Sequence, residues 1–362
     1  MSVAAGRLPG LDGLRIGAAL ALLVCHAGFW LAPLRLADSV WLLLGHVGVE
    51  AFLVFAGFLA ARRSLAAQVS DPLWRSWARV GLRLLPLYFL LLVVNLALAP
   101  EAQDIPLLQY LTLTQNLAWP HPPLFGEAWI VAAAALLLLM VAPICAYLRR
   151  QSFARGLLVL VGAIALAHVA RAAAVIHHDP AFDAGVRKVL VWRLDLPFYG
   201  VLMAWLWTRR EDAIRHLRVP LGAFGALALV VTAIVHLWVA VDHDVWARVF
   251  LVTLCDIGWL ALGLWACTLW GSGRAVRASA LLAGSFYAGL LTHMTLLRIG
   301  AELGMPTHAD DLASGVLLLS AYVVVATGLA LLVRGLLDRP LLALRERWVP
   351  ARAQHRDPVL ER

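Results

Sequence analysis

Stretches of about 20 mostly apolar residues recur along this chain, each bounded by proline, glycine or charged residues. A helix needs about 20 such residues to cross the hydrocarbon core of a bilayer, where every backbone polar group must be satisfied internally. The sequence therefore predicts an all-α, polytopic membrane protein with about ten transmembrane helices. The expected spans are 14–34, 41–61, 82–99, 128–148, 156–176, 189–207, 219–241, 247–270, 280–300 and 312–334.

Composition excludes the soluble classes of protein. Of the 362 residues, 62% are hydrophobic and 14% are charged, against roughly 25% charged residues in a globular domain. The net charge of +8 could suggest a nucleic-acid partner, but every basic residue except Lys188 is an arginine, and they lie in short loops between apolar runs. We therefore expect membrane lipids as partners and no nucleic acid. The four cysteines lie in apolar segments without metal-ligand spacing, so no metal site is expected.

The distribution of basic residues predicts the orientation. With the N-terminus in the cytoplasm, 23 of the 30 lysines and arginines fall on the cytoplasmic side and five on the other, as the positive-inside rule requires. Ten spans then place both termini in the cytoplasm. We expect a transmembrane domain over 1–334, a short basic tail over 335–362, and a long external loop over 100–127 with a re-entrant segment from Ile105 to Trp119.

Ionisable residues inside apolar spans are the candidate functional groups, because they are costly in a membrane. Arg15 and His26 are 11 residues apart, so they share one face of a helix at an axial separation of roughly 16 Å. An arginine at the cytoplasmic mouth can hold a phosphate, and a neutral histidine at depth can accept a proton. The alternative is an Arg15 that sets topology and a His26 that only hydrogen-bonds a neighbouring helix.

Five stretches carry a family resemblance in the right order. They are Leu8-Pro9-Gly10-Leu11-Asp12-Gly13-Leu14-Arg15 with His26 after ten residues, 45–59 (GHVGVEAFLVFAGFL), 83–88 (RLLPLY), 113–116 (LTQN) and 285–293 (SFYAGLLTH). Together they resemble the membrane-bound acyltransferase family 3. Too few residues follow position 334 to form a second domain. In this respect the chain is similar to the stand-alone, xanthan-type exopolysaccharide O-acetyltransferases.

The resemblance implies a multi-pass enzyme of the bacterial inner membrane. It would move an acyl group, in the first instance acetyl, from acyl-CoA to a sugar hydroxyl of an exopolysaccharide or lipid-linked glycan. Acyl-CoA is then a co-substrate and no cofactor is tightly bound. Polysaccharide assembly proteins are further candidate partners.

The same resemblance assigns roles to individual residues. His26 is the expected general base, and His293 helps to bind the acceptor, assists as an acid or makes a structural hydrogen bond. Arg15, Arg79 and Arg83 are expected to bind the phosphates of acyl-CoA. For Arg79 and Arg83 the alternative is anchoring by the positive-inside rule.

Four further residues are expected to support the site. Asp12 orients Arg15 or caps the first helix, whereas Arg193 and Asp195 form an internal ion pair or line the donor channel. Val80 and Ala56 depart from the family pattern, which has an arginine and a serine there. The family glutamate is also missing from 129–134 (WIVAAA), and Glu127 is the candidate to replace it.

Two other functions remain open on the sequence alone. A transporter or flippase for a small polar or lipid-linked solute could use His26 and the intramembrane arginines as a proton relay. Such a protein should show a weak inverted repeat, and none is visible here. A non-catalytic partner of a polysaccharide assembly machine is the third reading, suggested by the missing glutamate.

Overall fold

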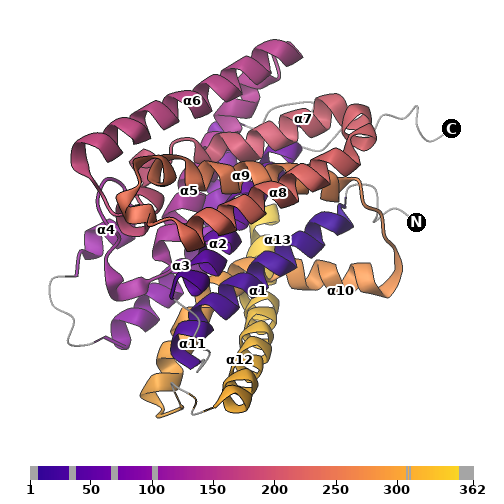
Figure 1. The fold of residues 1–362 in the computed structure, drawn as a ribbon. Helices are drawn as coiled ribbons and strands as arrows, with labels where there is room; N and C mark the ends of the chain where they lie inside the picture. The colour runs from indigo at the N-terminus through magenta and orange to yellow at the C-terminus, as the bar shows by residue number, and fades with distance from the viewer. Residues whose placement is uncertain are drawn as a thin grey trace.

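The computed structural model describes residues 7–31, 38–66, 72–99, 105–306, 309 and 311–349, and all regular elements within these ranges are helical. The α-helices are α1 (Pro9–Leu31), α2 (Asp38–Ala66), α3 (Leu73–Ala97), α4 (Leu107–Thr112), α5 (Ala128–Leu148), α6 (Phe153–His178), α7 (Leu196–His216), α8 (Arg218–Trp238), α9 (Val245–Cys267), α10 (Gly273–Gly284), α11 (Phe286–Glu302), α12 (Leu312–Val333) and α13 (Arg339–Trp348). Short 3₁₀ and π turns occupy Pro123–Phe125, Phe182–Arg187, Leu190–Trp192, Val241–His243 and Arg334–Asp338. The protein is therefore an all-α, polytopic membrane protein, as the sequence predicts (Figure 1).

The number of spans differs by one from the sequence prediction. Among the described residues, eight helices are long and apolar enough to cross a membrane, and α10 with α11 forms a ninth candidate bent by 54°. The missing candidate is the span expected over 189–207. Only residues 196–208 of α7 are uncharged, and 13 residues reach about 20 Å of the ~30 Å hydrocarbon core. A tenth crossing, and with it the side of the C-terminus, therefore remains a prediction.

A pair of reporter fusions after residues 182 and 212 tests this crossing. We expect the fusion after 182 to report the external side and the fusion after 212 the cytoplasmic side. The reason is the four arginines between 209 and 218, which the positive-inside rule retains in the cytoplasm. A fusion after residue 152 is the cytoplasmic control. If the fusions after 182 and 212 report the same side, α7 does not cross and the chain has nine spans.

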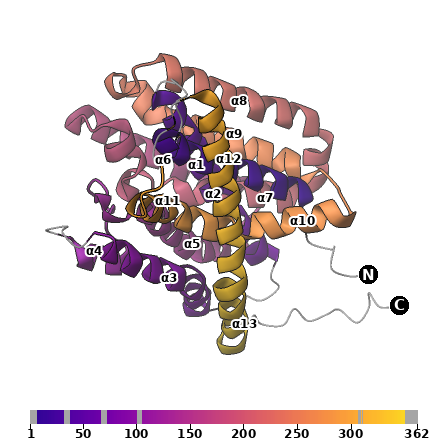
Figure 2. The same ribbon diagram turned by 90° about the horizontal axis from the view of Figure 1, so that it is seen from below.

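The centre of the bundle is formed by α2, α5 and α9. The peripheral helices are α12, at the lower edge of Figure 1, and α8, at the upper edge of Figure 2. About 61% of the apolar window of α2 and 72% of that of α9 is buried inside the protein, against 17% for α8 and α12. At the crossing of α2 and α7, Gly57 lies against Gly200. A Cβ atom added to Gly200 would lie 2.6 Å from the backbone nitrogen of Phe58. Small residues permit such close helix contacts in membranes. Glu50 on α2 and Asp256 on α9 are buried in this centre and are therefore shielded from lipid.

The last helices form one long rod. From Leu312 to Trp348 the chain stays helical through the π turn at Arg334–Asp338 (Figure 2). The end of this rod lies against α3, where Arg79 Nε donates to the carbonyl oxygen of Val349 at 2.9 Å and Arg79 Nη2 pairs with Glu346 at 3.4 Å. The boundary expected at residue 334 thus falls inside a continuous helix, and the division into two parts stays a prediction. Residues 350–362 lie outside the described part.

Candidate active site

Two histidines from opposite ends of the sequence meet within the helical bundle. His293 Nε2 on α11 lies 3.0 Å from His26 Nδ1 on α1, and the rings meet edge to face at 4.7 Å between centroids. His26 Nδ1 also lies 3.1 Å from the carbonyl oxygen of Leu22, and His293 Nδ1 lies 2.9 Å from that of Leu290. A carbonyl oxygen can only accept, so both Nδ1 atoms carry the proton. His26 Nε2 then keeps a lone pair that no described residue engages.

The surroundings of His293 hold this arrangement in place. His293 is fully buried, and Tyr322 on α12 donates from its hydroxyl group to the carbonyl oxygen of His293 at 3.1 Å. On the other side, Glu127 Oε1 accepts from the backbone N–H of Met294 at 3.0 Å. The helix that carries His293 is therefore fixed by two neighbouring elements.

Glu127 is the residue that the sequence offered in place of the family glutamate. Its carboxyl group is buried, and its Oε2 atom has no hydrogen-bond partner among the described residues. Burial raises the pKa of Glu127 to about 8, because the charged form is poorly solvated there. The carboxyl group is thus held against α11 next to His293, in a largely protonated form at neutral pH.

The three arginines expected to bind the donor have different environments. Arg15 is oriented by Asp12 at 3.2 Å and donates to the carbonyl oxygen of Ala283 at 2.7 Å. Arg79 is engaged by the end of the long C-terminal rod. Arg83 is exposed and has neither a hydrogen bond nor an ion pair with the described residues. Arg83 is therefore the member of the set that is available to an added anion.

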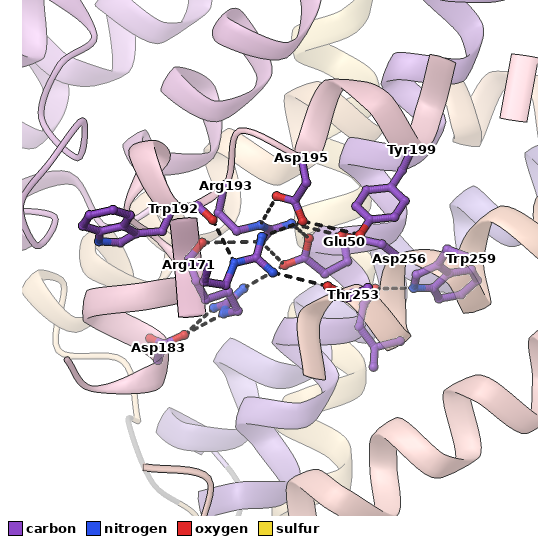
Figure 3. Close-up of polar contacts among 12 residues, drawn as sticks. Glu50, Arg171, Asp183, Trp192, Arg193, Asp195, Tyr199, Thr253, Asp256 and Trp259 are labelled. Atoms are coloured by element: carbon purple, nitrogen blue, oxygen red, sulfur yellow. Dashed lines mark hydrogen bonds and ion pairs between the residues drawn. The ribbon is translucent and has the colours of Figure 1, made fainter. Parts of the chain in front are cut away.

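A buried ion cluster joins α2, α6 and α9 to the segment just before α7, and it includes the other two expected residues. Arg193 donates to Glu50 on α2 at 2.8 and 3.1 Å and to Asp256 on α9 at 3.2 Å (Figure 3). Asp195 pairs with Arg171 on α6 at 2.5 Å, and lies 3.6 Å from Arg193 Nε. All five side chains are at most 2% exposed. Arg193 and Asp195 therefore belong to an internal ion-pair element, one of the two roles expected for them.

Three partners in this cluster were not identified from the sequence as partners of Arg193 and Asp195. Glu50, Arg171 and Asp256 each interrupt an otherwise apolar span, and an ionisable residue at membrane depth is expected to find a partner of opposite charge. That signal marks them as members of some buried network. It does not identify the partner, because the pairs join residues up to 143 positions apart.

The short segments on the expected external side are joined to each other. Asn116 Nδ2 donates to the carbonyl oxygen of Lys188 at 2.6 Å, and Leu190 N donates to the carbonyl oxygen of Asn116 at 2.9 Å. The guanidinium group of Arg187 lies over the ring of Trp129 at 5.0 Å. Residues 113–117 and 187–191 therefore form one wall, packed against the start of α5.

Asp183 neutralises part of this wall. Its carboxylate lies 2.5 Å from both Arg187 Nη2 and Lys188 Nζ. Burial alone would raise the pKa of Asp183, but the two adjacent cations outweigh burial and hold this pKa well below its ordinary value. Asp183 therefore stays ionised over the physiological pH range and offsets part of the positive charge of the wall. Among the described residues, no group of three or more histidine, cysteine, aspartate or glutamate side chains could hold a metal ion.

Comparison with known proteins gives one finding. A family model described as an acyltransferase domain matches residues 8–335, which is nearly the whole of the described chain. No curated protein and no solved structure shows a significant match to it.

Proposed function

The chain belongs to acyltransferase family 3, and from this premise we propose that it moves an acyl group from acyl-CoA to a sugar hydroxyl of an exopolysaccharide or lipid-linked glycan. It is a multi-pass membrane acyltransferase; the bacterial inner membrane, the acyl-CoA donor and the glycan acceptor are parts of the proposal. The proposal also includes polysaccharide assembly proteins as partners. The family match favours an enzyme over the transporter that the sequence left open. The observation that carries the chemistry is the free Nε2 lone pair of His26, fixed by the hydrogen bond to His293.

His26 is the proposed general base. Its Nε2 atom accepts the proton of the sugar hydroxyl while the hydroxyl oxygen attacks the thioester carbonyl carbon. The carbon–sulfur bond breaks, the coenzyme leaves as a thiolate, and the proton is returned from His26 to the sulfur. His293 accepts from the Nδ1–H group of His26 through its own Nε2 atom, so it orients the base and stabilises the imidazolium that forms.

The cytoplasmic arginines are the proposed donor site. Coenzyme A carries a pyrophosphate and a 3′-phosphate, and guanidinium groups bind phosphates by paired hydrogen bonds. Arg83 is free to do so, and Arg15 is held near it in electrostatic range. Arg79 supports this site indirectly, because it is engaged with Val349 and Glu346. The axial separation of roughly 16 Å between Arg15 and His26 leaves room for an extended thioester arm.

Titration of the purified protein with acetyl-CoA in detergent tests the donor site. We expect saturable binding by the wild type and weaker binding by Arg83→Lys and Arg15→Lys, by about tenfold each. Lysine keeps the charge and hence the insertion signal, but it loses the bidentate geometry. Arg277→Lys is the matched control, since Arg277 is exposed and has neither a hydrogen bond nor an ion pair with the described residues.

The possible outcomes separate the hypotheses. Absence of saturable binding by the wild type would remove the acyl-CoA donor, and with it the proposed function. Equal affinity in the wild type, Arg15→Lys and Arg83→Lys would place the phosphates elsewhere on the protein.

A further inference from the structure

An apolar groove runs along the side of the histidine pair. It has a volume of about 170 Å³ and lies between α1, the α10–α11 bend and α12. Its walls include Ile16 and Leu23 of α1, Gly289 and His293 of α11, and Ala326 of α12. His293 is the ring that holds His26 Nδ1. The groove is therefore lined by His293, the member of the pair that positions the proposed base, but the chemistry described so far does not use it.

The walls of the groove suit a hydrocarbon and little else. Apart from His293, the only polar side chains that line it are those of Ser285 and Thr327. The Ser285 hydroxyl group already donates to the carbonyl oxygen of Leu282 at 2.8 Å. A sugar, or the two amides of the pantetheine arm, would lose hydrogen bonds to water without replacement. An aliphatic chain gains from leaving water and requires no partner.

Both ends of the groove are defined by named contacts. Near its cytoplasmic end, Arg15 and Arg334 donate to carbonyl oxygens of the last turn of α10, those of Ala283 and Leu281. At the other end, next to His293, Leu23 of the wall packs in a buried apolar cluster with Tyr322 and Ala326. The groove therefore runs from this apolar cluster to an end that two arginines flank.

We propose that this groove binds the acyl chain of the donor thioester, and that the enzyme accepts acyl groups of medium length in addition to acetyl. The proposal rests on the proposed function, because it places the thioester carbonyl group at the histidine pair. The chain then extends from His293 along α11 toward the α10–α11 bend.

The length of the groove sets the chain length. Its α1 wall extends from Ile16 to Leu23, seven residues or about 10 Å along the helix axis. Carbon–carbon bonds of about 1.5 Å advance an extended chain by about 1.3 Å per carbon, so six to eight carbons fit. Glycine at position 289 leaves this space open, since a Cβ atom there would lie 3.4 Å from Ala330 Cβ.

The test compares the affinities of the full-length protein for hexanoyl-CoA and acetyl-CoA by titration in nanodiscs. We expect the wild type to bind hexanoyl-CoA at least about tenfold more tightly, because even one methylene in an apolar site gives this discrimination. Gly289→Leu fills the groove and should abolish the preference. Gly328→Leu is the matched control, because Gly328 lies outside the groove with open space around it, and it should keep the preference.

A second variant, Ala19→Leu, narrows the α1 wall and guards against misfolding of Gly289→Leu. It should reduce the preference as well. Equal affinity of the wild type for both thioesters would overturn the inference while leaving the proposed function intact. A preference for hexanoyl-CoA that survives in both Gly289→Leu and Ala19→Leu would overturn the inference in the same way. Failure of the wild type to bind either thioester would instead reject the proposed function itself.

Discussion

Replacing His26 by alanine should lower acyl transfer by about 10²–10⁴-fold, while the protein stays folded in the membrane and still binds acyl-CoA. The loss follows from the removal of the one nitrogen of the pair whose lone pair is free, His26 Nε2. The measurement is the acylation of surface polysaccharide in cells that express each variant at matched levels. His178→Ala is the matched control, because His178 is exposed at the end of α6.

The companion variant His293→Ala separates a base from a group that positions it. Without His293, the Nδ1–H group of His26 keeps its hydrogen bond to the carbonyl oxygen of Leu22, so the free lone pair stays on Nε2. We therefore expect a smaller loss than for His26→Ala, together with a shifted pH profile of the rate. Normal acylation by a well-expressed His26→Ala variant would refute the assignment of the base and return the transporter reading to consideration.

The second large effect concerns stability. Replacing Arg193 by methionine should destabilise the protein by about 3–5 kcal/mol, the usual cost of removing one partner from a buried ion pair. Asp256 would lose its guanidinium partner at 3.2 Å and remain buried with an uncompensated charge, while Glu50 would lose its closer partner at 2.8 Å and keep only Arg187 at 3.7 Å. The measurement is the unfolding midpoint of purified protein in one detergent.

Arg215→Met provides the control for this experiment. Arg215 pairs with Glu211 at 2.6 Å on an exposed helical turn, and such pairs contribute about 0–1 kcal/mol. If Arg193→Met costs as little as Arg215→Met, the buried cluster does not hold α2 and α9 to the segment before α7. A double variant that also carries Asp256→Asn should recover part of the lost stability, because it removes the buried charge that the loss of Arg193 leaves without its partner.

The helical class and most of the spans could be predicted because their causes are local. In a bilayer only a helix satisfies its own backbone within one segment, so a run such as 128–148 predicts its own structure, and α5 occupies Ala128–Leu148. The shared face of Arg15 and His26 is equally local, since it depends only on 3.6 residues per turn. Where local apolarity and buried charge conflict, as at 189–207, the sequence prediction was least reliable. There Arg193 and Asp195 are held by partners on other helices, and α7 begins only at Leu196.

The pairing of His26 with His293 was decided by the tertiary structure alone. The two residues are 267 positions apart, and no helical period relates residues on separate helices. Arg83 differs from Arg79 for the same reason, since α13 returns to α3 and engages Arg79 but not Arg83. Local sequence determines which groups each helix carries and on which face, because backbone geometry repeats every few residues. Which of these groups meet depends on how whole helices pack, and that is set by the summed contacts of the entire bundle.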